Sequence, residues 1–333
     1  MDHYAGIDVS LEQSSVCVVD ATGRIVREAK VASEPAALIT FLRGLNLPLV
    51  RIGLEAGPLS QWLQAALVKA GFEAVLLETR HVKAALSAMI VKTDRKDARG
   101  IAQLLRMGWF RPVHCKSAPA QEVRALLVAR KQLQAKMRDV ELSLRGLLRG
   151  FGLKVGEISK GQFAARVRTL VAGHTMLERI AQAMLQAREA LQMEFGKLHR
   201  AMLAIVRADA VCRRLMTVPG VGALVAVTFT SGVDAPERFA RSKGVGAHFG
   251  LTPRKHQSGE TDITGAVSRV GDVMVRTALY GAAHILLTRA VRFSALKRGP
   301  GGGEAARHEA SEGGAGMWVD GTTFRWGREI AAA

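Results

Sequence analysis

Residues 4–29 read YAGIDVSLEQSSVCVVDATGRIVREA, and this stretch sets the fold class of the first part of the chain. Short β-type runs over 4–9, 16–20 and 24–29 predict three strands, with Ala21-Thr22-Gly23 as the turn between the last two. Because two close connections follow one another, we expect these strands to form an antiparallel meander.

The residues after this meander alternate between strand and helix patterns. Strands are expected over 50–54 and 72–77, and helices over 35–45, 59–70, 82–89 and 94–107. Three meander strands followed by β-α units fit an α/β, RNase H-like sheet with helices on both faces.

The middle of the chain has the pattern of long helices. Ser117 with Pro119 predicts a helix start, apolar residues recur at helical spacing over 123–147, and Gly150-Phe151-Gly152 breaks the pattern. A second helical stretch covers 176–205. The two stretches predict either an antiparallel pair, which could be two ordinary packed helices of one subunit, or a dimerising coiled coil.

The last third is expected to be mainly helical. After Met216, short helices and Gly-rich turns are expected as far as Leu287, and from Arg298 the composition shifts to Gly-rich linker. The expected organisation is therefore an α/β domain over 1–112, a helical coiled-coil region over 113–208, a mainly α domain over 209–297 and an atypical tail over 298–333.

Composition narrows the classes of partner. The chain has 333 residues, 48% hydrophobic residues and a formal net charge of +18, which favours a polyanion, nucleic acid before a membrane surface. No apolar run reaches about 18 residues, so no membrane span is expected.

The first residues lack the layout of a signal peptide, and the cysteines Cys17, Cys115 and Cys212 lie far apart. We therefore expect no disulfide framework, no zinc site and a cytoplasmic, nucleoid-associated protein.

Four acidic residues form a candidate metal site. Asp8 is expected in the middle of the first, central strand, where a charge is costly unless it is compensated, and Glu55 ends the strand over 50–54. Asp94 and Asp97 share one face of a helix because they are three residues apart. Four oxygen donors of this kind suit Mg²⁺ or Mn²⁺, which could assist phosphoryl transfer. The alternative is that Asp94 and Asp97 are surface residues, paired with Arg95, Lys96 or Arg99.

Two further motifs suggest contacts with DNA. Pro219-Gly220-Val221-Gly222 resembles the turn of a helix-hairpin-helix, in which the N–H groups of Gly220 and Gly222 could face a phosphate. The alternative is an ordinary Gly-rich connection between helices.

Ser258 lies close in sequence to Arg254, Lys255 and His256, so it could be an exposed hydroxyl in a positive pocket, or simply a loop serine. Arg269 and Arg276 are candidate phosphate contacts that follow it.

Taken together, these motifs resemble the DEDD transposases of insertion-sequence family one hundred and ten, which are related to the Piv-type DNA invertases. The resemblance covers roughly residues 4–297. It rests on Gly6-Ile7-Asp8-Val9-Ser10, Glu55-Ala56-Gly57, Lys92-Thr93-Asp94-Arg95-Lys96-Asp97-Ala98, Val218-Pro219-Gly220-Val221-Gly222, Gly250-Leu251-Thr252-Pro253-Arg254 and Gln257-Ser258-Gly259.

The resemblance implies a recombinase that excises and inserts its own insertion sequence. It assigns Asp8, Glu55, Asp94 and Asp97 to a RuvC-like, metal-binding acidic quartet and Ser258 to the nucleophile. It further implies an element-encoded guide RNA and assembly as a homodimer or homotetramer through the middle helices.

One segment departs from the family pattern. Family members continue after Arg298 as a basic, Ala-rich helix, whereas residues 299–316 here are rich in Gly and Glu. The segment Met317–Trp326 again looks like the family. A pair of compensating frameshifts would produce this pattern, which we state as a hypothesis that resequencing tests.

Two other functions stay open at this level. A junction resolvase would use the acidic quartet and Mg²⁺ to hydrolyse DNA, with Ser258 idle. A decayed transposase would bind nucleic acid without catalysis, which the intact quartet disfavours and the atypical tail favours.

Overall fold

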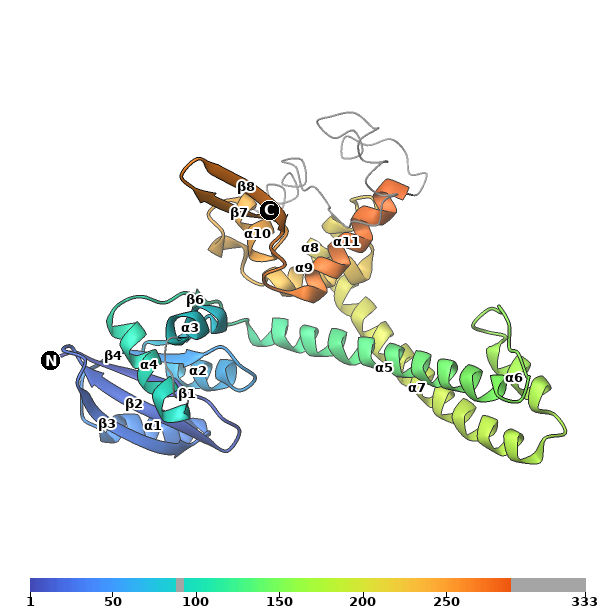
Figure 1. Ribbon diagram of the computed structural model, residues 1–333, viewed down its shortest axis with the longest axis horizontal. Helices are drawn as coiled ribbons and strands as arrows, with labels where there is room; N and C mark the ends of the chain where they lie inside the picture. Colours follow the sequence, from blue (N-terminus) through green and yellow to red (C-terminus); the bar gives the residue numbers. More distant parts are fainter. Residues whose placement is uncertain (88–92, 289–333) are drawn as a thin grey trace. The chain divides into compact units, whose positions relative to one another are not determined.

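The computed structural model describes residues 1–87 and 93–288 (Figure 1). The chain divides into two compact units, one covering Met1–Lys116 and one beginning at Ser117. Three predicted features lie outside the described residues: the end of the region 209–297, the Gly-rich segment 299–316 and the aromatic segment 317–326.

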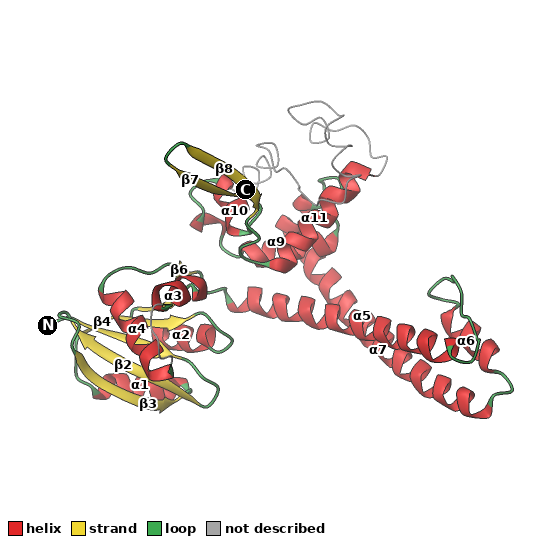
Figure 2. Ribbon diagram, in the orientation of Figure 1, coloured by secondary structure: helices red, strands yellow, loops and turns green. Residues whose placement is uncertain are grey.

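The first unit is built on one six-stranded sheet in the order β3-β2-β1-β4-β5-β6 (Figure 2). Its strands are β1 (His3–Asp8), β2 (Gln13–Asp20), β3 (Ile25–Ala32), β4 (Leu49–Glu55), β5 (Ala74–Leu77) and β6 (Pro112–Val113). The first three strands are antiparallel neighbours, while β1, β4 and β5 run parallel to one another. The predicted meander and the β-α units after it are confirmed. The two-residue edge strand β6 was not predicted.

Helices cover both faces of this sheet. They are α1 (Pro35–Gly44), α2 (Ser60–Lys69), α3 (Thr79–Leu86) and α4 (Asp94–Arg106). Ala5 and Ile7 of β1 pack with leucines of α1 and α2, whereas Tyr4 lies with Ala98 and Ala102 of α4. Successive strand residues point to opposite faces, so β1 is covered on both sides. This arrangement fits the RNase H-like fold predicted for the first domain.

A long antiparallel helix pair follows, formed by α5 (Ala118–Arg149) and α7 (Thr175–Ala208) and joined through α6 (Phe163–Val171). Leu144 near the end of α5 packs in one cluster with Leu177 near the start of α7. Leu127 near the start of α5 packs with Met202 near the end of α7. The two predicted helical stretches therefore pair within one chain (Figure 1). The helix start is also confirmed, because the side chain of Ser117 accepts a hydrogen bond from the backbone N–H of Ala120 at 3.3 Å.

The last part of the second unit packs around the end of this pair, where Leu127 and Met202 join Phe229, Phe249 and Val275 in one core. Its elements are α8 (Ala210–Leu215), α9 (Ala223–Val233), the short 3₁₀ helix η1 (Pro236–Arg238), α10 (Ser242–His248), β7 (Pro253–Ser258), β8 (Thr261–Val267) and α11 (Val273–Thr288).

The expectation of only helices and Gly-rich turns in this part was wrong at one place. Strands β7 and β8 form an antiparallel hairpin. Strand β7 reads PRKHQS, and every one of its residues is exposed. A strand without a buried face needs no alternation of apolar and polar residues, so the pattern that predicts a strand is absent here.

None of the described helices is long and apolar enough to cross a membrane. All three cysteines lie within the described ranges, and no disulfide joins them.

Candidate active-site residues

Asp8 and Glu55 lie at the same edge of the sheet. Each is the last residue of its strand, and the preceding residues Ile7 and Leu54 are register partners in the parallel pair β1·β4. Adjacent strands lie about 4.8 Å apart, so the two partly buried carboxylates belong to neighbouring positions. Asp8 therefore ends β1, and the expectation that it occupies the middle of this strand was wrong.

Helix α4 runs antiparallel to β1. Its Ala98 and Ala102 lie directly against Gly6, where an added Cβ would come within 2.2 Å and 2.4 Å of their backbone atoms. Near its end, the side chain of Gln103 donates to the carbonyl oxygen of Gly23 at 2.7 Å. Gly23 lies in the turn after β2, and the end of β2 pairs with the start of β1. The start of α4 therefore lies toward the edge where Asp8 ends β1.

This orientation brings the first turn of α4, with Asp94 and Asp97, toward the edge that carries Asp8 and Glu55. Asp94 is exposed and Asp97 is partly buried. Acidic residues in a first turn also stabilise a helix through its dipole, so both carboxylates have a structural role here beside the predicted one. The topology directs the first turn of α4 toward the edge that carries Asp8 and Glu55, and a shared metal-binding role for the four residues stays a prediction.

Two arginines that flank the acidic residues of α4 bind Glu28 on β3. Arg95 donates from Nε at 2.7 Å, and Arg99 donates from Nη2 at 3.2 Å. The hydrogen bond from Arg95 is the main reason that the pKa of Glu28 is held below its ordinary value, with a further contribution from Arg99. Arg95 and Arg99 thus have a carboxylate partner on β3, and the alternative that Asp94 and Asp97 are surface residues stays open.

The donor set suits a hard divalent cation, because all four predicted ligands are carboxylates. Within the described ranges, however, no three His, Cys, Asp or Glu side chains are gathered closely enough to hold a metal ion. The structure places the quartet toward one edge without assembling it into a binding site.

The Gly220–Gly222 segment lies in the connection between α8 and α9, which both the helix-hairpin-helix and an ordinary Gly-rich connection predict. Gly220 has φ +86°, and an added Cβ would lie 2.4 Å from the carbonyl oxygen of Ala282 on α11. Gly222 is the N-cap residue of α9. Gly220 is therefore required for packing against α11, and a phosphate contact by Gly220 or Gly222 stays a prediction.

Ser258 is the last residue of β7 and lies, exposed, beside the hairpin turn Gly259-Glu260. Neighbouring strand residues alternate between faces, so Lys255 and Ser258 point to opposite faces of the hairpin. Lys255 forms an ion pair with Asp262 of β8 at 3.0 Å. The positive pocket predicted around Ser258 is therefore an exposed hairpin tip, and Arg254 is an exposed residue near the other end of β7.

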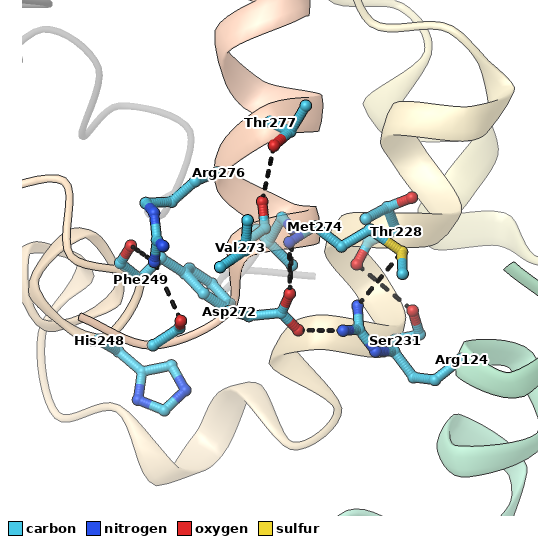
Figure 3. A network of polar contacts seen from close by, with 12 residues as sticks. Arg124, Thr228, Ser231, His248, Phe249, Asp272, Val273, Met274, Arg276 and Thr277 are labelled. Atoms are coloured by element: carbon cyan, nitrogen blue, oxygen red, sulfur yellow. Dashed lines mark hydrogen bonds and ion pairs between the residues drawn. The ribbon is translucent and has the colours of Figure 1, made fainter. Parts of the chain in front are cut away.

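Arg269 and Arg276 differ in their surroundings. Arg269 is exposed and has φ +56°. Arg276 donates from Nη1 to three backbone carbonyl oxygens, those of Phe249 at 3.2 Å, Val270 at 2.6 Å and Gly271 at 3.0 Å (Figure 3). The structure thus gives Arg276 a role in packing that the sequence did not suggest, while a phosphate contact by Arg269 stays a prediction.

Sequence reasoning missed Asp272, which caps α11. Its Oδ1 accepts from the N–H groups of Met274 at 2.8 Å and Val275 at 3.2 Å, and its Oδ2 pairs with Arg124 of α5 (Figure 3). An aspartate directly before an apolar helical run is a typical N-cap signal, so this residue could have been found from the sequence. Its partner Arg124 lies 148 positions earlier, and no local pattern indicates it.

Two family models match this chain. One, described as a transposase of the IS110 DEDD type, matches residues 5–152, which include Asp8, Glu55, Asp94 and Asp97. The other, described as "Transposase IS116/IS110/IS902 family", matches residues 212–297, which include Ser258.

Curated relatives agree with these models. The chain is 26% identical over 287 residues to "Transposase for insertion sequence element IS1111A" of Coxiella burnetii, which spans 85% of this chain and 77% of the relative. It is 25% identical over 287 residues to "Probable family 20 transposase" of Pseudomonas aeruginosa, which spans 85% of this chain and 83% of the relative.

Among solved structures, "T. thermophilus RuvC in complex with Holliday junction substrate" is 17% identical and covers 34% of this chain and 100% of its own, with a TM-score of 0.27. The strand order, rather than this weak likeness, supports the RNase H-like fold. Both family models and the curated relatives point the same way, and the chain belongs to the IS110 family of DEDD transposases and is a DNA transposase.

Proposed function

We propose that this transposase excises and inserts an insertion sequence by cleaving and rejoining DNA strands, with a divalent cation at the acidic quartet and Ser258 as nucleophile. The observation that carries the proposal is the placement of Asp8 and Glu55 at the ends of adjacent parallel strands, with the first turn of α4 directed toward the same edge.

Asp8, Glu55, Asp94 and Asp97 would hold Mg²⁺ or Mn²⁺. Their carboxylates suit such an ion by donor type, and their side chains must draw together to bind it, because the described residues contain no assembled group of ligands. When bound, the cation supplies positive charge that stabilises the phosphate in its transition state. The positive charge of the cation would also reduce the repulsion between these carboxylates and an approaching DNA phosphate.

Ser258 would attack the DNA phosphodiester. Its exposed position beside the hairpin turn lets its Oγ reach the backbone of a large substrate. The bond from Oγ to phosphorus forms as the bond from phosphorus to the leaving deoxyribose oxygen breaks. The serine hydroxyl loses its proton and the leaving oxygen takes up one, which leaves the protein joined to the DNA through a phosphodiester.

DNA, and an element-encoded guide RNA, would bind through the excess of positive charge. The net charge of +18 supports polyanion binding in general, while the RNA follows only from the family resemblance. Arg254, Lys255 and Arg269, which are exposed on or beside the hairpin that carries Ser258, are the proposed phosphate contacts. Assembly as a homodimer or homotetramer follows from the same resemblance.

A metal-dependent junction resolvase is the second candidate. It is favoured by one observation, that the acidic quartet belongs to the first unit and Ser258 to the second. The quartet could then hydrolyse DNA without any covalent protein–DNA intermediate, and Ser258 would be a surface residue.

One experiment separates these functions. The protein is expressed with the flanking DNA of its element, and circular excision junctions are counted by sequencing for wild type, Asp8→Asn and Ser258→Ala. We expect junctions in wild type and none in either variant. Asp139→Asn on α5 and Ser159→Ala in the loop before α6 are the matched controls, since both residues are exposed.

Each other outcome points elsewhere. Full activity in Asp8→Asn would contradict the metal site. DNA cleavage that persists in Ser258→Ala would favour the resolvase. An absence of junctions in wild type would be followed by replacing residues 299–316 with a family-like helix, and continued failure would contradict the transposition proposal.

A further inference from the structure

Arg276 of α11 contacts the base of the hairpin that carries Ser258, where Arg254 also donates from Nη2 to the carbonyl oxygen of Ser268 at 3.4 Å. Nη1 of Arg276 donates to the carbonyl of Phe249, which precedes β7, and to those of Val270 and Gly271, which follow β8. One guanidinium nitrogen therefore bonds both to the segment before β7 and to the segment after β8.

The backbone at this base is closely packed. Gly250 has φ +66°, and an added Cβ would lie 2.2 Å from the N atom of Val270. Gly271 has φ +76°, and an added Cβ would lie 2.2 Å from the carbonyl oxygen of His248. Arg269 also donates from its N–H to the carbonyl of Gly250 at 3.1 Å. The two segments thus touch without intervening side chains, and Arg276 adds hydrogen bonds to both of them.

Arg276 is itself fixed relative to the rest of the second unit. It lies on α11, whose start is capped by Asp272, and Asp272 pairs with Arg124 of α5. The side chains of Arg124 and Asp272 are only 19% and 17% exposed, so water screens their attraction less than at an open surface. A continuous set of contacts therefore runs from α5 through α11 to the hairpin.

We propose that Arg276 is a positioning residue, which sets the place of Ser258 by holding the hairpin base and does not act as a phosphate ligand. This inference rests on the proposed role of Ser258. A nucleophile must lie within a fraction of an ångström of its productive position, so a loosened hairpin lowers the rate of attack without removing any contact to DNA.

The two roles predict different results for Arg276→Lys and Arg276→Gln. Lysine keeps the positive charge but loses the planar, multi-donor head. If Arg276 positions the hairpin, both variants should form the covalent protein–DNA complex about 100-fold more slowly than wild type. Both should bind the DNA of the element ends with the wild-type affinity and salt dependence. If Arg276 contacts a phosphate, Arg276→Lys should preserve most of the activity. Arg276→Gln should then weaken DNA binding and lower the slope of log affinity against log salt by about 0.9.

Hydrogen–deuterium exchange of the full chain supplies a readout that is independent of activity. Amides of residues 253–267 should exchange faster in both Arg276 variants, while those of α5 and α7 stay as in wild type. Arg179→Gln, which removes an exposed charge from α7, is the control and should leave exchange and the rate of complex formation unchanged.

Unchanged exchange in the hairpin, or a wild-type rate in Arg276→Lys, would overturn the inference. The proposed function fails separately, if Ser258→Ala forms the covalent complex at the wild-type rate. In that case the exchange measurement still decides whether Arg276 holds the hairpin.

Discussion

Arg99 of α4 donates a hydrogen bond to Glu28 of β3, with Nη2 at 3.2 Å from Oε1. Arg95, one turn earlier, binds the other oxygen of the same carboxylate. This contact ties the first turn of α4 to the sheet, and it keeps two cationic side chains on the β3 side of the helix, next to the two acidic residues that the proposed metal site uses.

Glu28→Gln should lower thermal stability at neutral pH and should have little effect at acid pH. In the folded protein the pKa of Glu28 lies below its ordinary value, because Arg95 and Arg99 bind its carboxylate. The charged carboxylate therefore stabilises the fold at any pH above that ordinary value. The stabilisation is lost as pH falls below the ordinary glutamate pKa of about 4.3 and through the folded pKa. Unfolding midpoints measured from pH 7 to pH 3 should therefore converge for the two proteins. Parallel curves would show that the ion pairs contribute nothing.

Gly6→Ala should destabilise the first unit strongly. An added Cβ would lie 2.2 Å from the carbonyl oxygen of Ala98, so α4 must move away from the sheet and carry Asp94 and Asp97 with it. We expect a loss of about 1–3 kcal/mol in the free energy of unfolding. Gly44→Ala at the end of α1 is the control, because nothing lies within 4 Å of its added Cβ. Denaturant unfolding measures both, and equal midpoints would contradict the close approach.

The structure shows why part of this architecture could be predicted from the sequence. The strands β1 to β5 follow from short runs of β-type residues, and the common edge of Asp8 and Glu55 follows from parallel pairing. The hairpin β7–β8 did not, because all residues of β7 are exposed and a strand without a buried face has no apolar period.

The role of Arg276 shows a second limit. Its carbonyl partners lie as many as 27 residues away in the sequence. An arginine that binds backbone carbonyls cannot be told from one that binds a phosphate by its residue type. A charge in the sequence predicts attraction to an anion, whereas only the tertiary contacts show that the donor is already used.

Divalent cations should stabilise the wild-type protein if the quartet binds them. A cation at a concentration 100 times its Kd adds about 2.7 kcal/mol to the free energy of unfolding of the unit that binds it. Asp8→Asn should lose this stabilisation by Mn²⁺, so that its unfolding midpoints with and without the metal coincide. Asp139→Asn, on the exposed side of α5, should respond to Mn²⁺ as wild type does. A Mn²⁺ response that survives in Asp8→Asn would place the cation elsewhere.

Binding to DNA should weaken steeply as salt rises, because positive side chains release counterions from the phosphates. Arg254→Gln should lower the slope of log affinity against log salt by about 0.9 if Arg254 contacts one phosphate. Lys255→Gln should have a smaller effect, since Lys255 already pairs with Asp262 at 3.0 Å. Fluorescence anisotropy with a labelled duplex over a salt series measures both slopes. Identical slopes for wild type and Arg254→Gln would remove this residue from the interface.

Thiol reactivity should distinguish the three cysteines of the native protein. Burial raises the pKa of Cys17 to about 11 and that of Cys212 to about 11, so both are protonated at pH 8. Cys115 is partly exposed. Because the thiolate is the reactive form, a maleimide at pH 8 should label Cys115 first, and mass spectrometry of peptides identifies the site.

Cys17 also reports on the position of α4, because it lies between this helix and the sheet. If Gly6→Ala displaces α4, Cys17 should be labelled in this variant at the rate of Cys115. Labelling of Cys17 at the rate of Cys115 in the wild-type protein would contradict the packing of α4 on the sheet, and with it the placement of Asp94 and Asp97.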